Sequence, residues 1–148
     1  MKVKAISINP VDYKVRGNED ALNMVYGTDR PAILGWDIAG TVVSVGDNVT
    51  QFKAGDNVFG MVNFPGAGKA YAEYVAAPAS HLAKMPENVS FEEAAATTLA
   101  ALTALQALQN NVKKGDRVLV HAGSGGVGHF AIQIAKNLGA YMITTSSA

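Results

Sequence analysis

The stretch Gly115–Lys136, GDRVLVHAGSGGVGHFAIQIAK, decides the fold of the C-terminal part of this chain. Within it, Arg117–Ala122 is a short apolar run of strand length. Gly123, Gly125 and Gly128 then stand at the spacing G-x-G-x-x-G. Three glycines in any turn can match that spacing, so the motif carries weight only when a strand precedes it and a helix follows it.

The residues after the glycines have the period of an amphipathic helix. Apolar side chains recur at i, i+3, i+4, i+7, i+8 and i+11, which is one face of an α-helix. They are Val127, Phe130, Ala131, Ile134, Ala135 and Leu138. Gly139 follows as a C-cap. The pattern therefore predicts strand, glycine-rich turn and helix, an arrangement that binds a pyrophosphate at the positive end of the helix.

The turn itself supplies the candidate cofactor-binding residues. Glycines there allow a tight turn, close approach of the backbone to phosphate and close packing of helix on strand. The residues are Gly123, Ser124, Gly125, Gly126, Val127 and Gly128. A phosphate loop of the mononucleotide kind is disfavoured, because His129 and Phe130 stand where Lys and Ser or Thr are required.

The residues after the next strand indicate which dinucleotide binds. A carboxylate about 20 residues beyond the glycines normally binds the ribose 2′-hydroxyl of NAD. Here the strand Tyr141–Thr145 is followed by small residues, and no Asp or Glu occurs after Asp116. The hydroxyls of Thr145, Ser146 and Ser147 would not repel a 2′-phosphate. The sequence thus favours NADP(H), with the basic residue that grips the phosphate not visible in the chain.

Composition excludes several classes of partner and chemistry. Hydrophobic residues make up 49% of the 148 residues, and the formal net charge is zero, so neither nucleic acid nor an anionic membrane is indicated. The absence of cysteine excludes disulfides, thiolate metal ligands and a cysteine nucleophile. The first residues lack the apolar core of a signal peptide, and the apolar segment Ala94–Leu108 is shorter than a membrane span. We therefore expect a cytoplasmic protein.

The part before residue 90 has the pattern of an all-β module. Short β-like runs alternate with turn signals that contain Gly, Pro, Asn and Asp, which is typical of a small barrel or sandwich. The runs are Met1–Ile8, Gly40–Val45, Asn57–Met61 and Tyr71–Ala76.

A capping box marks the start of a helical region. Ser90 is the expected N-cap and Glu93 the reciprocal partner three residues later. The helical pattern continues to about Asn110, with a break expected near Thr97–Leu99. A polar connection then leads into the glycine motif.

Four segments of the chain resemble the medium-chain dehydrogenase/reductase superfamily, specifically its zinc-independent quinone oxidoreductase branch, which is zeta-crystallin-like. They are Ile8–Arg16 (INPVDYKVR), Leu34–Gly40 (LGWDIAG), Gly68–Val75 (GKAYAEYV) and Gly115–Lys136. The resemblance implies an α/β plus β chain: a GroES-like β-barrel catalytic domain at 1–90, connecting helices at 91–111, and the first β-α-β unit of a Rossmann NADP-binding domain at 112–148.

The resemblance also implies a longer protein. Relative to the family, about two strands are expected before Met1 and more than half of the Rossmann domain after Ala148. The missing half would hold the 2′-phosphate contacts and the sheet edge that forms a homodimer. We therefore expect the 148-residue chain alone to be inactive.

The resemblance identifies the positions where zinc-dependent relatives hold their metal. Asn9 stands at the first cysteine position, Gly35-Trp36-Asp37 replaces Gly-His-Glu, and Ala96–Thr98 offers no thiolate. Catalytic zinc needs three protein ligands and an open position, and this set does not supply them. No metal site is predicted.

The same alignment of motifs gives candidate catalytic residues. The amide of Asn9 is the first candidate to stabilise a developing oxyanion or enolate. Tyr13 and Lys14 are candidates to orient the carbonyl or relay a proton, and Thr103 lies on the helix that runs near the nicotinamide in relatives. Asn9 and Thr103 also have simpler structural interpretations, as a turn residue and as a core-helix residue. Asp12 and Arg16 are more typical of a surface or support pair.

The function expected on these grounds is NADPH-dependent hydride transfer to a quinone or an α,β-unsaturated carbonyl, without zinc. Such acceptors already draw electron density, so they need less Lewis-acid help than an ordinary carbonyl. Three alternatives remain. The chain could be a non-catalytic dinucleotide-binding or structural, crystallin-like protein, a co-chaperone-like barrel, or a relative of the zinc alcohol dehydrogenases.

Overall fold

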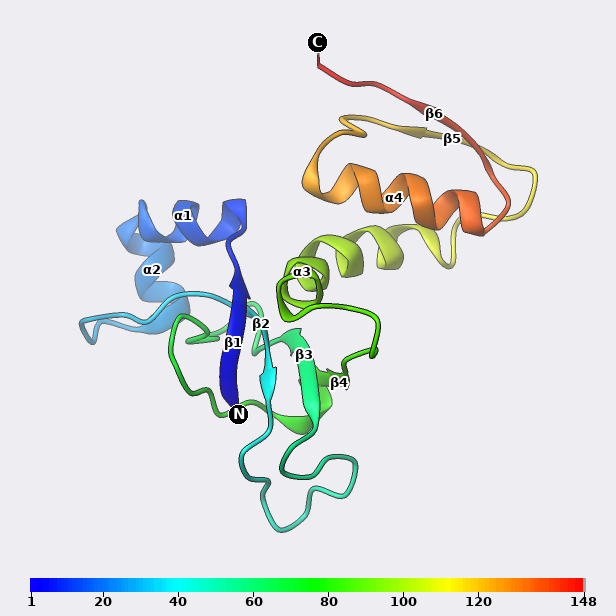
Figure 1. Ribbon diagram of the computed structural model, residues 1–148. Coiled ribbons are helices and arrows are strands. Elements are labelled where there is room, and N and C mark those ends of the chain that lie inside the picture. Colours follow the sequence, from blue (N-terminus) through cyan, green and yellow to red (C-terminus); the bar gives the residue numbers. More distant parts are fainter. Residues whose placement is uncertain (148) are drawn as a thin grey trace. The chain divides into compact units, whose positions relative to one another are not determined.

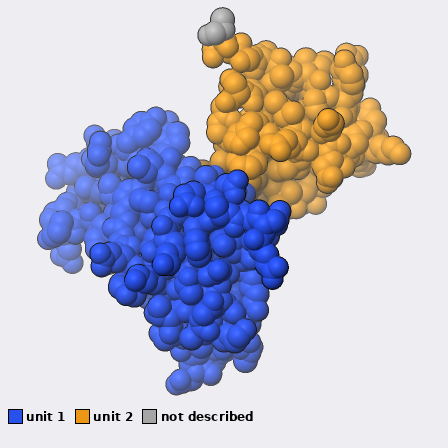
Figure 2. Space-filling view, viewed as in Figure 1, with its two compact units in different colours: residues 1–98 blue, residues 99–148 orange. Residues whose placement is uncertain are grey.

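The computed structural model describes residues 1–147, which divide into two compact units (Figure 2). Unit 1 comprises residues 1–98 and unit 2 begins at Leu99. The division falls inside helix α3 (Phe91–Leu108). The domain bounds at 90 and 111 that the sequence suggests therefore stay predictions.

Unit 1 is built on a four-stranded antiparallel sheet with the order β1-β2-β3-β4 (Figure 1). The strands are β1 (Lys2–Ser7), β2 (Asp37–Thr41), β3 (Asn57–Met61) and β4 (Leu82–Lys84). The first and third of these were predicted from the sequence. Within residues 1–147 the sheet is open, so the predicted closure into a barrel is wrong for the part of the chain described.

Two predicted strands have different bounds or do not form. The run Gly40–Val45 overlaps β2 only to Thr41, because Val42 then leaves the sheet and exchanges backbone hydrogen bonds with the turn at Gly55 and Asp56. The run Tyr71–Ala76 makes only one isolated bridge, between Lys2 and Tyr74. At both places the sequence alternates between apolar and polar residues, but the backbone does not pair with a neighbouring strand along the whole run.

Two helices follow β1 that the sequence analysis missed. Helix α1 (Pro10–Arg16) has proline in its first turn and helix α2 (Glu19–Tyr26) begins with two acidic residues. The side chain of Asn18 caps α2 by accepting a hydrogen bond from the backbone N–H of Ala21 at 3.0 Å. Asparagine, proline and acids at a helix start are recognisable signals, so both helices could have been predicted.

Helix α3 confirms the predicted capping box and contradicts the predicted break. Ser90 N donates to Glu93 Oε2 at 2.8 Å, and Glu93 N donates to Ser90 Oγ at 3.2 Å. The helix continues without interruption to Leu108, because the hydroxyl of Thr97 donates to the carbonyl of Glu93 one turn earlier at 2.7 Å. The threonines thus satisfy their polar groups within the helix.

The core of unit 1 centres on β2, whose residues 37–40 are all buried. One cluster joins Ile38 to Val62, Ala70 and Val75. On the other face, Ala39 packs with Ala94 and Ala95 of α3. Burial of both faces explains why this strand reads DIAGT rather than as an alternation of apolar and polar residues.

Unit 2 contains the predicted strand, turn, helix and strand. The strands β5 (Arg117–Val120) and β6 (Tyr141–Thr144) pair in parallel, and α4 (Gly126–Asn137) connects them (Figure 1). The predicted apolar face of α4 lies in the core of this unit, except that Val127 is 39% exposed. Gly139 has φ +83, and the hydrogen bonds of Gly139 N to Lys136 O and of Ala140 N to Ala135 O form a Schellman motif. The predicted C-terminal stop is confirmed.

The same four-residue turn precedes β3 and β5. In Lys53-Ala54-Gly55-Asp56 and in Lys113-Lys114-Gly115-Asp116 the aspartate N–H donates to the lysine carbonyl at 3.1 Å. Each aspartate carboxylate also accepts from the lysine N–H. The central glycines have φ of +92 and +90.

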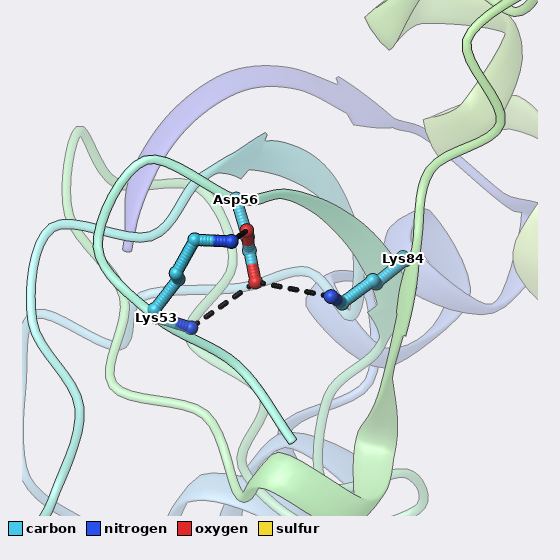
Figure 3. Close-up of polar contacts among 3 residues, drawn as sticks. All are labelled: Lys53, Asp56 and Lys84. Carbon is cyan, nitrogen blue, oxygen red and sulfur yellow. Dashed lines mark hydrogen bonds and ion pairs between the residues drawn. The ribbon is translucent and has the colours of Figure 1, made fainter. Parts of the chain in front are cut away.

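The first of these turns is tied to β4 by charge. Asp56 lies between Lys53 and Lys84, at 3.1 and 3.5 Å (Figure 3). The hydrogen bonds from Lys53 hold the pKa of Asp56 below its ordinary value. The ionised carboxylate therefore favours the folded state above the ordinary pKa, and this contribution is lost as the pH falls through the lowered one.

We expect Gly55→Ala and Gly115→Ala each to lower the free energy of unfolding by about 1 kcal/mol, because a Cβ is disfavoured at positive φ. A Cβ at either glycine would meet no atom within 4 Å, so the cost is conformational alone. Gly46→Ala is the control, since Gly46 is equally open and lies outside the positive-φ region. Urea unfolding measures all three, and a neutral Gly115→Ala would contradict the prediction.

Candidate functional site

Asn9 lies between β1 and α1 and is fixed by contacts in two directions. Its side chain and Asp12 form a reciprocal capping box at the start of α1. In it, Asn9 N donates to Asp12 Oδ2 at 2.6 Å, and the Asn9 side chain accepts from the Asp12 N–H. In the other direction, Asn9 Nδ2 donates to Asp37 Oδ2 on β2 at 2.9 Å. An amide nitrogen carries two hydrogens, so one N–H remains for a ligand.

The residues that surround Asn9 belong to the buried interior of unit 1. Asp37 is 0% exposed and Asp12 only 3%. Trp36 is 1% exposed and donates from Nε1 to the carbonyl of Gly66 at 2.6 Å, so it is a core residue. Of the surface or support role expected for Asp12 and Arg16, the surface part is wrong for Asp12, because α1 turns this side chain inward while Arg16 stays exposed.

Two tyrosine hydroxyls are buried in the same region. Burial, reinforced by the charge of Asp12, raises the pKa of Tyr26 to about 12. The same two causes, in the same order, raise the pKa of Tyr71. Both phenols are therefore neutral at physiological pH, so each hydroxyl keeps its proton and is able to donate a hydrogen bond. Tyr71 lies within the segment Gly68–Val75, whereas Tyr26 lies in none of the segments singled out from the sequence, and no role was predicted for either.

A small cavity of about 90 Å³ opens beside this group. Its lining residues are Ile8, Asp12, Tyr13, Arg16, Leu34 and Tyr71. Tyr13 is thus brought to the buried aspartate, while its ring remains 54% exposed. Lys14 is exposed on α1 and does not line this cavity. Of the three predicted catalytic residues, the structure brings together Asn9 and Tyr13 around Asp12.

The glycine turn in unit 2 depends on two of its glycines for packing. A Cβ at Gly128 would lie 2.2 Å from the carbonyl oxygen of Ala122, and one at Gly123 would lie 2.0 Å from Thr144 Oγ1. Gly125 is less crowded, and a Cβ at Gly126 would meet no atom within 4 Å. The tight turn itself is made by Ala122, a non-glycine residue with φ +53. Gly123, the first glycine of the motif, is therefore required for packing. The residue with left-handed backbone conformation is Ala122, one position before it.

The predicted hydroxyl residues gather beside this turn. Thr145 accepts through Oγ1 from Ala122 N at 3.2 Å, and its carbonyl accepts from Gly123 N at 2.8 Å. Ser146 Oγ donates to Ser124 Oγ at 3.2 Å. Ser147 is exposed, and its carbonyl accepts from Ser146 at 3.0 Å. The exposed hydroxyls of the residues that follow β6 thus lie beside the start of the glycine turn.

The N-terminus of α4 has the form of an anion site. Its N-cap is Gly125, and no side chain caps the first turn, which also holds Gly126 and Val127. Backbone N–H groups at such an end attract phosphate. Thr103 belongs to the same unit, but its hydroxyl donates to the carbonyl of Leu99 at 2.7 Å and makes no hydrogen bond to the glycine turn.

Within residues 1–147 no three His, Cys, Asp or Glu side chains are grouped so that they could hold a metal ion. The histidines are engaged separately. His81 accepts from Asn63 N, His121 contacts Thr145 Oγ1, and His129 contacts the carbonyl of Gly125.

Comparison with known proteins identifies the family of this chain. The model of the alcohol dehydrogenase GroES-like domain matches residues 1–87. A chloroplast envelope quinone oxidoreductase homolog of Arabidopsis thaliana is 40% identical over the whole chain, which spans 46% of that relative's length. The chain belongs to the medium-chain dehydrogenase/reductase superfamily, in its quinone oxidoreductase branch.

Two solved structures of quinone oxidoreductases share the fold of this chain. That of Coxiella burnetii superposes with a TM-score of 0.90 at 46% identity, covering 99% of this chain and 46% of the other. That of Escherichia coli, complexed with NADPH, gives 0.82 at 36% identity and covers 99% and 43%. This member of the branch therefore spans less than half the length of the relatives it matches. None of its helices within residues 1–147 is long and apolar enough to cross a bilayer.

We expect Gly128→Ala to destabilise this medium-chain reductase chain by about 3 kcal/mol, because the new methyl would overlap backbone atoms that cannot move aside. Gly126→Ala is the matched control on the same helix. It should be neutral or stabilise the protein by up to about 1 kcal/mol, since it adds a better helix former in open space. Thermal unfolding distinguishes the two, and equal effects would show that the close approach of helix and turn is unimportant.

Proposed function

We propose that the protein carrying this chain transfers hydride from NADPH to a quinone or an α,β-unsaturated carbonyl without zinc. The observation that carries the proposal is the uncapped N-terminus of α4 beside a group of hydroxyls with no acidic side chain. Phosphates are favoured at such a helix end, and small hydroxyls leave room for the additional 2′-phosphate. The E. coli relative was solved with NADPH.

The cofactor, when bound, supplies the hydride. The residues of this chain have the remaining tasks. The backbone of residues 125–127 would bind the pyrophosphate, and the hydroxyls of Thr145, Ser146 and Ser147 would face the adenosine ribose. The remaining N–H of Asn9 would donate to the acceptor oxygen, on which negative charge develops as the hydride arrives. Tyr13 and Lys14 would orient the acceptor, and Thr103 would lie near the nicotinamide.

Zinc independence rests on the chemistry of the side chains present. Asn9 uses its amide to hold Asp37, which is a structural contact rather than metal ligation. A quinone or enone needs no Lewis acid to become an acceptor, in contrast to an ordinary carbonyl. We further propose that the protein is cytoplasmic, acts on a small molecule and forms a homodimer.

NADPH oxidation by the full gene product, followed with a naphthoquinone, an enone and a simple aldehyde, tests the proposal. We expect turnover of the quinone or the enone, weak turnover of the aldehyde, and no stoichiometric zinc by metal analysis. Stoichiometric zinc with alcohol oxidation would favour a zinc alcohol dehydrogenase. NADPH binding without turnover of any acceptor would favour the structural, crystallin-like alternative.

We expect Ser146→Asp to shift the cofactor preference from NADPH toward NADH. The new carboxylate would repel the 2′-phosphate and accept from a ribose 2′-hydroxyl instead. The Kd for NADPH should rise by at least about tenfold, which corresponds to 1.4 kcal/mol, as measured by the fluorescence of the bound nicotinamide. Ser146→Ala is the control for loss of the contact with Ser124 and should change the Kd little. An unchanged preference in Ser146→Asp would place the ribose elsewhere.

A further inference from the structure

Residues 1–147 contain two capping boxes, and one of the two has a buried carboxylate. On α3 the N3 carboxylate, Glu93, is exposed, although it makes the same reciprocal contact with Ser90 that Asp12 makes with Asn9. A solvated carboxylate therefore suffices to start a helix. Asp12 is only 3% exposed, and burial of a charged group is costly unless its partners compensate. Helix capping alone does not account for the burial of this carboxylate.

The second carboxylate oxygen of Asp12 is buried near two tyrosine hydroxyls that take no part in capping the helix. Asp12 Oδ1 and the hydroxyls of Tyr26 and Tyr71 are all buried, and within residues 1–147 none meets a partner at full hydrogen-bond geometry. The Tyr71 hydroxyl lies near enough to the Asp12 carboxylate for a hydrogen bond between them to help raise the pKa of Tyr71. Both hydroxyls lie close enough for the charge of Asp12 to act on them. Asp12 and Tyr71 also line the cavity of about 90 Å³, a volume sufficient for ordered water. Buried polar groups of this kind are retained for a reason other than packing.

The other carboxylate oxygen connects this group to the candidate catalytic residue. Asp12 Oδ2 holds the backbone N–H of Asn9 at 2.6 Å, and the backbone of Asp12 donates to the Asn9 side chain. Asp37 holds the amide nitrogen of Asn9 from the opposite direction at 2.9 Å. These contacts leave Asn9 a single orientation.

We propose that Asp12 is a positioning residue that acts through Asn9. One of its oxygens anchors Asn9, and the other is held by the neutral hydroxyls of Tyr26 and Tyr71, directly or through water in the cavity. The remaining Asn9 N–H is thereby presented in one orientation to the oxygen of the acceptor. This inference rests on the proposed function for its effect on turnover, whereas the orientation of Asn9 can be measured without turnover.

A double-mutant cycle in the full gene product tests the kinetic effect. Asp12→Asn and Asn9→Ala should each lower kcat with a quinone by about tenfold or more, and the double variant should be no slower than the slower single variant, because groups that act as a unit are not additive. The KM for NADPH should stay within about twofold, since the proposed role of Asp12 concerns the acceptor oxygen and not the phosphates of the cofactor. Glu93→Gln changes the exposed N3 carboxylate of the other capping box, so it is the matched control and should retain wild-type kcat.

Nuclear magnetic resonance tests the structural part directly. The side-chain amide resonances of Asn9, identified by their loss in Asn9→Ala, should be a single sharp pair in ¹⁵N-labelled wild type. They should shift or broaden in Asp12→Asn and stay unchanged in Glu93→Gln. If Asp12→Asn does not fold, as judged by circular dichroism, Tyr71→Phe takes its place in both experiments, with a smaller loss of kcat of about threefold expected for one missing hydroxyl.

The experiments distinguish failure of the positioning role of Asp12 from failure of the proposed function. Unaltered kcat in Asp12→Asn, additive losses in the cycle, or unchanged Asn9 resonances would overturn the positioning role. A wild-type protein that oxidises NADPH with none of the acceptors would overturn the proposed function, and the resonances of Asn9 would still show whether Asp12 orients it.

Discussion

The hydrogen bond from Asn9 to Asp37 is the constraint on which the site in unit 1 depends. It joins the start of α1 to β2, the strand that is buried on both faces. A carboxylate at 0% exposure needs donors around it, and the amide of Asn9 is one of them. The contact therefore serves the fold and, in the proposed mechanism, the chemistry as well. It stabilises a buried charge, and it fixes the one amide hydrogen that remains for a ligand.

Unit 2 has a constraint of a different kind, one of distance rather than charge. The carbonyl of Ala122 approaches the backbone of Gly128 so closely that no side chain fits between them. This approach brings the first turn of α4 next to the end of β5 and leaves the N–H groups there without a side-chain cap. Packing that admits only glycine thus produces a helix end of the kind that attracts anions, and this geometry needs no charged side chain.

Much of the fold was readable from the sequence wherever the signal is local. The glycine spacing with its helical period predicted β5, α4 and β6, and the pair Ser90 and Glu93 predicted the start of α3. The strand pattern failed where alternation lacked a pairing partner, as in 71–76. The break expected in α3 failed because Thr97 bonds back within its own helix. Helices α1 and α2 were missed although their caps follow ordinary rules.

The candidate site was less predictable because its central feature is not local. Asn9 was found through a motif, but the burial of Asp12 depends on Tyr26 and Tyr71, which α2 and a later irregular segment bring to it. The spacing of these residues along the chain does not predict that they meet in space. Likewise, the position of the left-handed residue at Ala122, one place before the first glycine, follows from how the turn closes on Thr145.

The Lys-x-Gly-Asp turn appears in front of an antiparallel strand in unit 1 and of a parallel strand in unit 2. Two hydrogen bonds close the turn within its own four residues in both places. In both places the glycine N–H and the aspartate carbonyl also bond outward, to Val42 in unit 1 and to Gly139 and Tyr141 in unit 2. The turn therefore acts as an adapter: it closes on itself and leaves one donor and one acceptor placed for whichever segment runs beside it.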